Sequence, residues 1–108
     1  MAAPSRARLK KAMLAIFLEP DKDKKKKRSK EFTKLLFSYV GAKAKTKDED
    51  EITILQMQSI SLFSQYVFRK NKEKSEEKEK SAKKIFEEIA QESDELYDEI
   101  DEAASHPV

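Results

Sequence analysis

The stretch AKKIFEEIAQESDELYDEIDEA, residues 82–103, decides the fold class of this chain. Its apolar and small residues recur at alternating intervals of four and three positions, a heptad spacing that places them along one stripe of an α-helix. The stripe consists of Ala82, Phe86, Ile89, Ser93, Leu96, Ile100 and Ala103. The pattern predicts a long C-terminal helix, with Ile85 and Tyr97 flanking its stripe.

Such a stripe has two interpretations. It packs inside the chain's own bundle, or it pairs copies of the chain with one another. Pairing would bring several copies of a binding region together and raise the apparent affinity. The polar Ser93 in mid-stripe would weaken a tight coiled coil or allow close helix approach. We predict an oligomer or partner interface formed by Phe86, Ile89, Ser93, Leu96 and Ile100.

Two segments nearer the N-terminus also have helical spacing of apolar residues. The first runs from about residue 5 to residue 19, with Ser5 as its N-cap and Pro20 ending it. The second runs from about residue 29 to residue 41. Ser29 is its expected N-cap, and Gly41 stands where a left-handed C-terminal cap would be expected.

A third segment starts near Thr46 or Asp48 and carries two apolar faces. The main face comprises Ile52, Leu55, Ser59, Leu62, Phe63, Tyr66 and Val67, and the second comprises Ile54, Met57, Ile60 and Phe68. Two faces predict the most buried helix of the fold. A strand is disfavoured because alternation breaks at Gln56 and Gln58. The C-terminal helix is expected to begin near Ser75, or to continue this one with a kink at Asn71.

Length and composition predict one domain over residues 1–108. One Gly and three Pro are too few for a turn-rich β protein, and without Cys the fold must be held by packing. We expect residues 20–28 (PDKDKKKKR) to form an exposed basic loop, and residues 1–4 and 105–108 to be disordered. The predicted fold is all-α: a small three- or four-helix bundle with a long C-terminal helix.

Charge is distributed very unevenly along the chain. Residues 1–30 hold 11 Lys/Arg against 3 Asp/Glu, a net of +8, whereas residues 73–108 hold 5 against 13, a net of −8. The whole chain is only +2. Such asymmetry between chain ends indicates a polyanionic partner for the basic end, or neutralisation by the acidic end. The acidic helix could also fold back on the basic segment and compete with nucleic acid.

The basic N-terminal region is the candidate binding site. Exposed cations attract phosphates and release condensed counterions, which gives salt-sensitive affinity with little sequence information. The predicted nucleic-acid-binding residues are Arg6, Arg8, Lys10, Lys11, Lys22, Lys24, Lys25, Lys26, Lys27, Arg28 and Lys30. Lysine predominates, and direct base reading favours Arg, Asn and Gln, so we expect weak preference for sequence. The alternatives are a solvated loop that maintains solubility and a protein-binding surface.

The chain contains few side chains of the kinds that enzymes use as acids, bases or nucleophiles. The one His is His106, near the end, and a single Gly excludes a glycine-rich phosphate loop. A zinc site of Cys and His is excluded, and no EF-hand spacing occurs. We therefore expect no enzyme activity, no metal and no cofactor.

The longest apolar run, residues 12–18, is too short to cross a bilayer, so we expect a soluble protein without a membrane partner. A cytoplasmic location is expected. Residues 24–28 (KKKKR) also have the pattern of a nuclear import signal, which would apply in a eukaryotic or viral setting.

Two aromatic residues lie off the main apolar stripe of their own helix. Tyr66 belongs to a core stripe, but Phe68 and Phe37 are expected to be exposed and to mark a contact surface. Phe68 precedes Arg69, an arrangement suited to base stacking. The functional hypothesis is a non-catalytic, self-associating accessory or regulatory protein that binds DNA or RNA. The alternative is an adaptor or inhibitor that docks on a protein through its C-terminal heptad helix.

Overall fold

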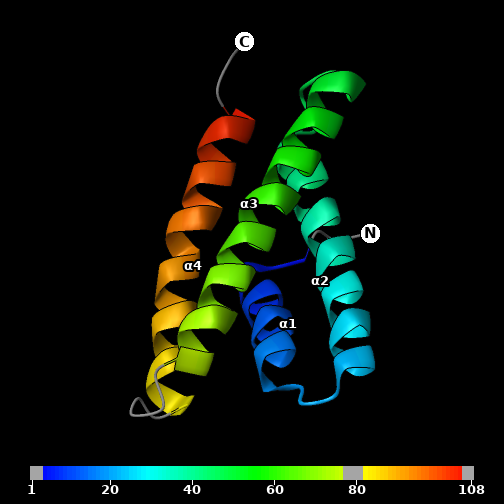
Figure 1. Cartoon of the computed structure of the whole chain (residues 1–108). Helices are drawn as coiled ribbons and strands as arrows, with labels where there is room; N and C mark the ends of the chain where they lie inside the picture. Colours follow the sequence, from blue (N-terminus) through cyan, green and yellow to red (C-terminus); the bar gives the residue numbers. More distant parts are fainter. Residues whose placement is uncertain (1–3, 77–81, 106–108) are drawn as a thin grey trace.

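The computed structural model describes residues 4–76 and 82–105, and within them it contains helices and no strand. The helices are α1 (Arg6–Leu18), α2 (Lys22–Lys43), α3 (Glu49–Glu76) and α4 (Ala82–Ser105). Consecutive helices run in opposite directions and pack side by side into a bundle of 46 × 25 × 21 Å (Figure 1). The predicted all-α class is confirmed, and of the predicted three or four helices the described residues contain four.

Two predicted helix starts are confirmed by capping hydrogen bonds. The Ser5 hydroxyl accepts from the Arg8 backbone N–H at 3.2 Å, and the Asp48 carboxylate accepts from the Glu51 N–H at 2.9 Å. Each bond satisfies a backbone donor that has no partner within its own helix. Glu49, Asp50 and Glu51 also place negative charge at the positive end of the α3 dipole.

The predicted loop at residues 20–28 is wrong, because α2 begins at Lys22 and Ser29 is not its cap. Lysine is a good helix former, and extending a helix that is already anchored costs little compared with nucleating one. The anchored part of α2 is its buried stripe Phe32, Leu36, Tyr39 and Val40. The lysine run lacks apolar residues, so it has no periodic signal by which sequence alone would reveal the helix.

Gly41 does not end α2, which continues to Lys43 and a buried Ala44. Its backbone φ is not positive, so no left-handed cap forms there. A Cβ at Gly41 would lie 3.1 Å from Nε2 of Gln56, which donates to the Phe37 carbonyl at 3.0 Å. The glycine therefore gives room for a contact between α2 and α3.

The third helix also runs further than predicted. Ser75 lies inside α3, which continues unbroken through Asn71 to Glu76, and α4 begins at Ala82. The two helices pack as an antiparallel pair, not as one kinked helix (Figure 1). At the chain ends, Pro4 is buried and Ser105 is the last residue of α4. The other terminal residues predicted to be disordered, and His106, lie outside the described residues.

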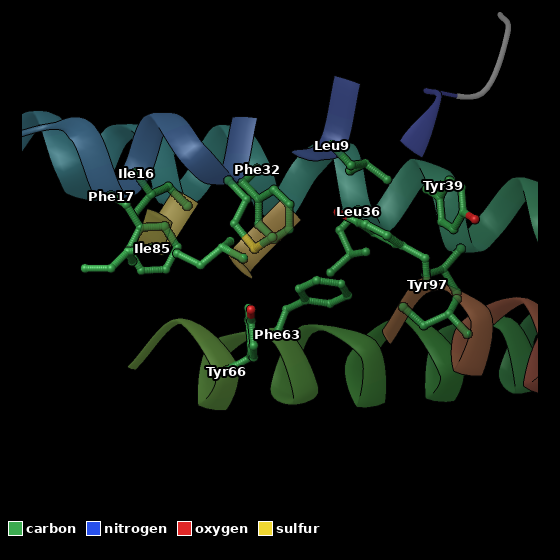
Figure 2. Packing of buried hydrophobic residues seen from close by; sticks show 14 residues of the cluster. Leu9, Ile16, Phe17, Phe32, Leu36, Tyr39, Phe63, Tyr66, Ile85 and Tyr97 are labelled. Atoms are coloured by element: carbon green, nitrogen blue, oxygen red, sulfur yellow. The ribbon is translucent and has the colours of Figure 1, made fainter. Parts of the chain in front are cut away.

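The core lies where the four helices meet. Phe63 of α3 points toward the other helices (Figure 2), and its ring centroid lies 5.5 Å from that of Phe32 and 5.0 Å from that of Tyr97. Tyr97 also contacts Tyr39, with 5.8 Å between ring centroids. Such aromatic pairs add to the stabilisation from buried area. The aromatic residues thus join α2, α3 and α4.

The buried stripe of α4 differs from the predicted heptad stripe. Its buried residues are Ile85, Ile89, Ser93, Tyr97, Ile100 and Ala104. The two predicted flanking residues are thus in the core, whereas Phe86 and Leu96 are half-buried and Ala103 is exposed. The steps of four from Ile85 to Tyr97 drift around the helix axis, as expected for a helix that packs on several neighbours instead of one coiled-coil partner.

Candidate nucleic-acid interface

Arg6, the first predicted phosphate-binding residue, is held by the chain's own acidic helix. Its Nη2 lies 2.6 Å from an Asp101 oxygen and 2.8 Å from an Asp98 oxygen, and its Nη1 lies 3.6 Å from Asp94. Its Nε donates to the Tyr39 hydroxyl at 3.3 Å. We call these five residues the Arg6 cluster. The cluster fastens the start of α1 to α4.

Titration within the Arg6 cluster reflects these contacts. The hydrogen bonds to Asp101 and Tyr39 raise the pKa of Arg6. Burial favours the neutral form of Asp101, but hydrogen bonds from Tyr39 and Arg6 outweigh it and lower the pKa of that carboxyl. Burial and the bond to Asp101 raise the pKa of Tyr39 to about 12. Arg6 is therefore committed to an internal ion pair.

Three more predicted residues are engaged within the fold. Lys10 Nζ lies 2.7 Å from Asp94, which places it beside the Arg6 cluster. Arg28 pairs with Glu19 at 3.3 Å and ties the start of α2 to the end of α1. Lys25 Nζ donates to the Asn71 side-chain oxygen at 3.2 Å and bridges α2 to α3. The acidic helix thus neutralises part of α1 and pairs with Lys43 at the end of α2, but it pairs with none of the predicted lysines at the start of α2.

The other predicted residues are exposed and form no ion pair within the described part of the chain. They are Arg8, Lys11, Lys22, Lys24, Lys26, Lys27 and Lys30. Arg8 and Lys11 lie on α1, and the five lysines lie on the first turns of α2. Lys24 and Lys27 flank a shallow polar hollow with Arg28 and Glu31.

Because the lysine run is helical, its members are ordered in space. Lys22, Lys26, Lys30 and Lys34 follow one another at intervals of four, which places successive members next to each other in a row that winds by about 120° around α2. All four side chains are exposed. At 1.5 Å per residue the row extends for about 18 Å. We call these four residues the lysine ridge.

Sequence reasoning missed Lys34 as a member of this ridge. With a loop expected at residues 20–28, no helical interval connects Lys22 and Lys26 to Lys30 and Lys34. The signal was present in the sequence as KDKKKKRSKEFTK, residues 22–34, and becomes visible once the helix starts at Lys22.

Beside the ridge, an apolar groove of about 290 Å³ separates α2 from α3. The α2 wall comprises Ser29, Phe32, Thr33 and Leu36; the α3 wall comprises Ile60, Phe63, Ser64, Val67, Phe68 and Asn71; and Ile16 of α1 also contributes. We call this the α2–α3 groove. The side chain of Lys25 reaches across one end of it to Asn71.

The second apolar face predicted for α3 is largely open, so the prediction that α3 is the most buried helix is wrong. Phe68 is 75% exposed, Met57 64% and Ile54 55%, whereas only Ile60 packs partly against the core. The main face is buried as expected, including Tyr66. The predicted exposure of Phe68 and Phe37 is confirmed.

The predicted interface residues of α4 pack inside the bundle. Ile89, Ser93 and Ile100 are buried, and Phe86 and Leu96 are half-buried against the core. The Ser93 hydroxyl donates to the Ala90 carbonyl of its own helix at 3.0 Å, so its polar group is satisfied without a partner chain. These five residues are therefore wholly or partly covered by contacts within the bundle.

A buried lysine with two carboxylate partners, which sequence reasoning missed, lies near the C-terminal end of α3. The Lys70 side chain is only 8% exposed, and its Nζ lies 2.9 Å from Glu92 and 3.1 Å from Glu73. The Tyr66 hydroxyl donates to Glu92 at 2.9 Å. Burial lowers the pKa of Lys70, but its bonds to Glu92 and Glu73 outweigh that effect and raise it. This cluster fastens α3 to α4 and leaves Lys70 unavailable to phosphate.

Among the described residues, no group of acidic or histidine side chains could hold a metal ion. No helix in that part of the chain is long and apolar enough to cross a membrane. No family model, curated protein or solved structure matches this chain.

Proposed function

We propose that this protein is a non-catalytic, accessory or regulatory nucleic-acid-binding protein that contacts phosphates through the lysine ridge of α2. The observation that carries this proposal is the arrangement of Lys22, Lys26, Lys30 and Lys34 in one exposed row without ion pairs in the described chain. The chain contains 21 Asp and Glu residues, yet none of those described forms an ion pair with this row. A row of free ammonium groups is suited to a line of phosphates.

The distribution of the acidic residues supports the same proposal. Asp94, Asp98 and Asp101 are engaged with Arg6 and Lys10 of α1. The cationic side chains therefore fall into two sets: one forms ion pairs that stabilise the fold, and the other is exposed to solvent. Lys22 and Lys24 of the second set also lie in the first turn of α2, where the helix dipole favours anions.

The expected binding mode is sequence-tolerant. Ammonium groups act as point charges and position a phosphate backbone without reading bases. We do not propose docking or self-association through α4, because the residues that would form that interface are buried or half-buried within the bundle.

The test is a fluorescence anisotropy titration with labelled single-stranded DNA, single-stranded RNA and duplex DNA at about 50 and about 200 mM salt. The double variant Lys26→Gln, Lys30→Gln should weaken binding. It should also reduce the slope of log affinity against log salt by about 1.4 for a single strand, since each lost phosphate contact removes about 0.7.

The matched control removes two exposed lysines outside α2, Lys45→Gln and Lys83→Gln. It has the same net charge as the ridge variant, so equal losses in both would show that only total charge matters. Equal losses, or no association with any of these nucleic acids at about 50 mM salt, would refute the proposal.

A further inference from the structure

The α2–α3 groove and the lysine ridge share one edge. Ser29 and Thr33 line the groove, and Lys26 and Lys30 each precede one of them by three positions. Residues three apart are neighbours on a helix surface. The two lysines, both exposed, therefore stand along the α2 rim of the groove.

The opposite rim carries the most exposed aromatic side chain. Lys25 is bonded to Asn71, and the Phe37 carbonyl to Gln56, which sets the antiparallel register of α2 and α3. In that register Phe68, three residues before Asn71, lies across the groove from about residues 26–28. An exposed ring thus faces the part of the rim that holds the ridge lysines.

A second exposed ring lies further along the groove. Phe37 is 39% exposed and follows Thr33 by four positions, on the same side of α2. The register places Phe37 and Phe68 about ten residues apart along the bundle, or about 15 Å. At about 3.4 Å per stacked nucleotide this distance spans roughly four nucleotides.

We propose that the α2–α3 groove binds single-stranded nucleic acid, with bases stacking on Phe68 and Phe37 while the backbone follows the lysine ridge. This inference rests on the proposed nucleic-acid function and names its substrate class. Proteins that bind single strands combine a basic track with aromatic platforms, because every base has a π-face and every nucleotide has a phosphate.

The groove chemistry agrees with this occupant. Ser29, Thr33, Ser64 and Asn71 bring hydroxyl and amide groups to a wall that is otherwise apolar and aromatic. A base presents the same combination, with flat apolar faces and polar edges. In a duplex the faces are stacked on neighbouring base pairs and cannot reach Phe68. The groove therefore favours a single strand over a duplex.

The test measures the affinity of the full chain for a labelled, unstructured strand of about 20 nucleotides and for its duplex, since single-strand sites cover roughly 4–16 nucleotides. Phe68→Ala should weaken single-strand binding about 5- to 150-fold, the effect of losing one stacked base. The salt slope should stay unchanged, because no phosphate contact is lost. Phe68→Tyr should keep the affinity of the original chain, and circular dichroism should report the same fold for both variants.

The matched control is Ile54→Ala, which removes an exposed apolar side chain from the same helix, at a separate hollow lined also by Leu55 and Ala103, without removing a ring. It should leave affinity unchanged. Single-strand binding that tolerates Phe68→Ala, or duplex binding as tight as single-strand binding, would overturn the stacking inference and leave the phosphate-binding proposal standing. A failure of the ridge variant to weaken any binding would instead overturn the proposed function.

Discussion

Replacing Arg6 by methionine should destabilise the fold while leaving nucleic-acid binding intact. Methionine retains much of the aliphatic length but removes the guanidinium that joins α1 to α4 in the Arg6 cluster. The contact that matters most is with Asp101, at 2.6 Å, because Arg6 is 31% and Asp101 27% exposed at the side chain. Asp98 is 70% exposed, and its contact should add little.

The magnitude follows from that one strong contact. A hydrogen bond to a charged group contributes about 1.5–3 kcal/mol. Asp101 keeps its 2.6 Å bond from the Tyr39 hydroxyl, so it is not left unpaired. We therefore expect the free energy of unfolding to fall by about 2–3 kcal/mol, with a decrease in Tm of roughly 10–20 °C for a domain of this size.

The assay is urea unfolding followed by far-ultraviolet circular dichroism. Arg8→Met is the control, since Arg8 is exposed and forms no ion pair within the described residues, and it should change stability by less than about 0.5 kcal/mol. If Arg6→Met and Arg8→Met are equally stable, the structural role assigned to the Arg6 cluster is wrong.

The pH dependence supplies a second readout of the same substitution. The pKa of Asp101 is lower in the folded chain than its usual unfolded value of about 3.9. The stability that the ionised Asp101 contributes to the fold is therefore fully present above that pH. The contribution is lost as the pH falls through the lowered folded pKa. The stability difference between the original chain and Arg6→Met should therefore be largest near neutral pH and shrink below about pH 4. A difference independent of pH would contradict the assignment.

Four further substitutions probe the packing. Tyr97→Phe should stabilise the fold by about 1 kcal/mol in urea unfolding, because the Tyr97 hydroxyl is buried without a hydrogen-bond partner in the described chain. Tyr39→Phe should instead lower the free energy of unfolding by about 1.5–3 kcal/mol, because it loses a hydrogen bond to a carboxylate. Equal effects of the two substitutions would refute these assignments. Ser93→Leu should lower the free energy of unfolding by about 1–3 kcal/mol, because the larger side chain overpacks a buried site. Light scattering should show no increase in association. An increase would indicate that Ser93 lies in an interface between copies of the chain. Gly41→Ala should raise the Tm in a Gln56→Ala background, because alanine is less flexible than glycine in a helix and its Cβ then meets no side chain. With Gln56 present the Tm should hardly change, because the Gln56 amide must move to make room for the Cβ. The same change in Tm in both backgrounds would refute this explanation.

Local sequence was sufficient to predict most helices. The spacing of residues 52–67 and the caps at Ser5 and Asp48 depend on neighbours within a few positions, and all were found in the structure. The same logic failed at residues 20–28. Lysines have good helix propensity but no apolar period, so the pattern could not distinguish a helix from a loop there.

The candidate site was predicted only in part, because some of its features depend on local sequence and others on the fold. The basic character of residues 22–30 is a property of composition and needs no fold. The lysine ridge needs helical geometry, and the α2–α3 groove needs two helices whose groove-lining residues are separated by about 25 or more positions in sequence.

What the sequence determined by itself was the helical class, the exposed Phe37 and Phe68, and the abundance of basic side chains near the start. The tertiary structure alone decided which cations are free. Arg6 meets Asp101 across 95 positions of chain, whereas Lys26 and Lys30 meet no carboxylate in the described part of it. Charge pairing depends on distances of a few ångströms between helices, and those distances are set by packing of the whole bundle, not by any local pattern.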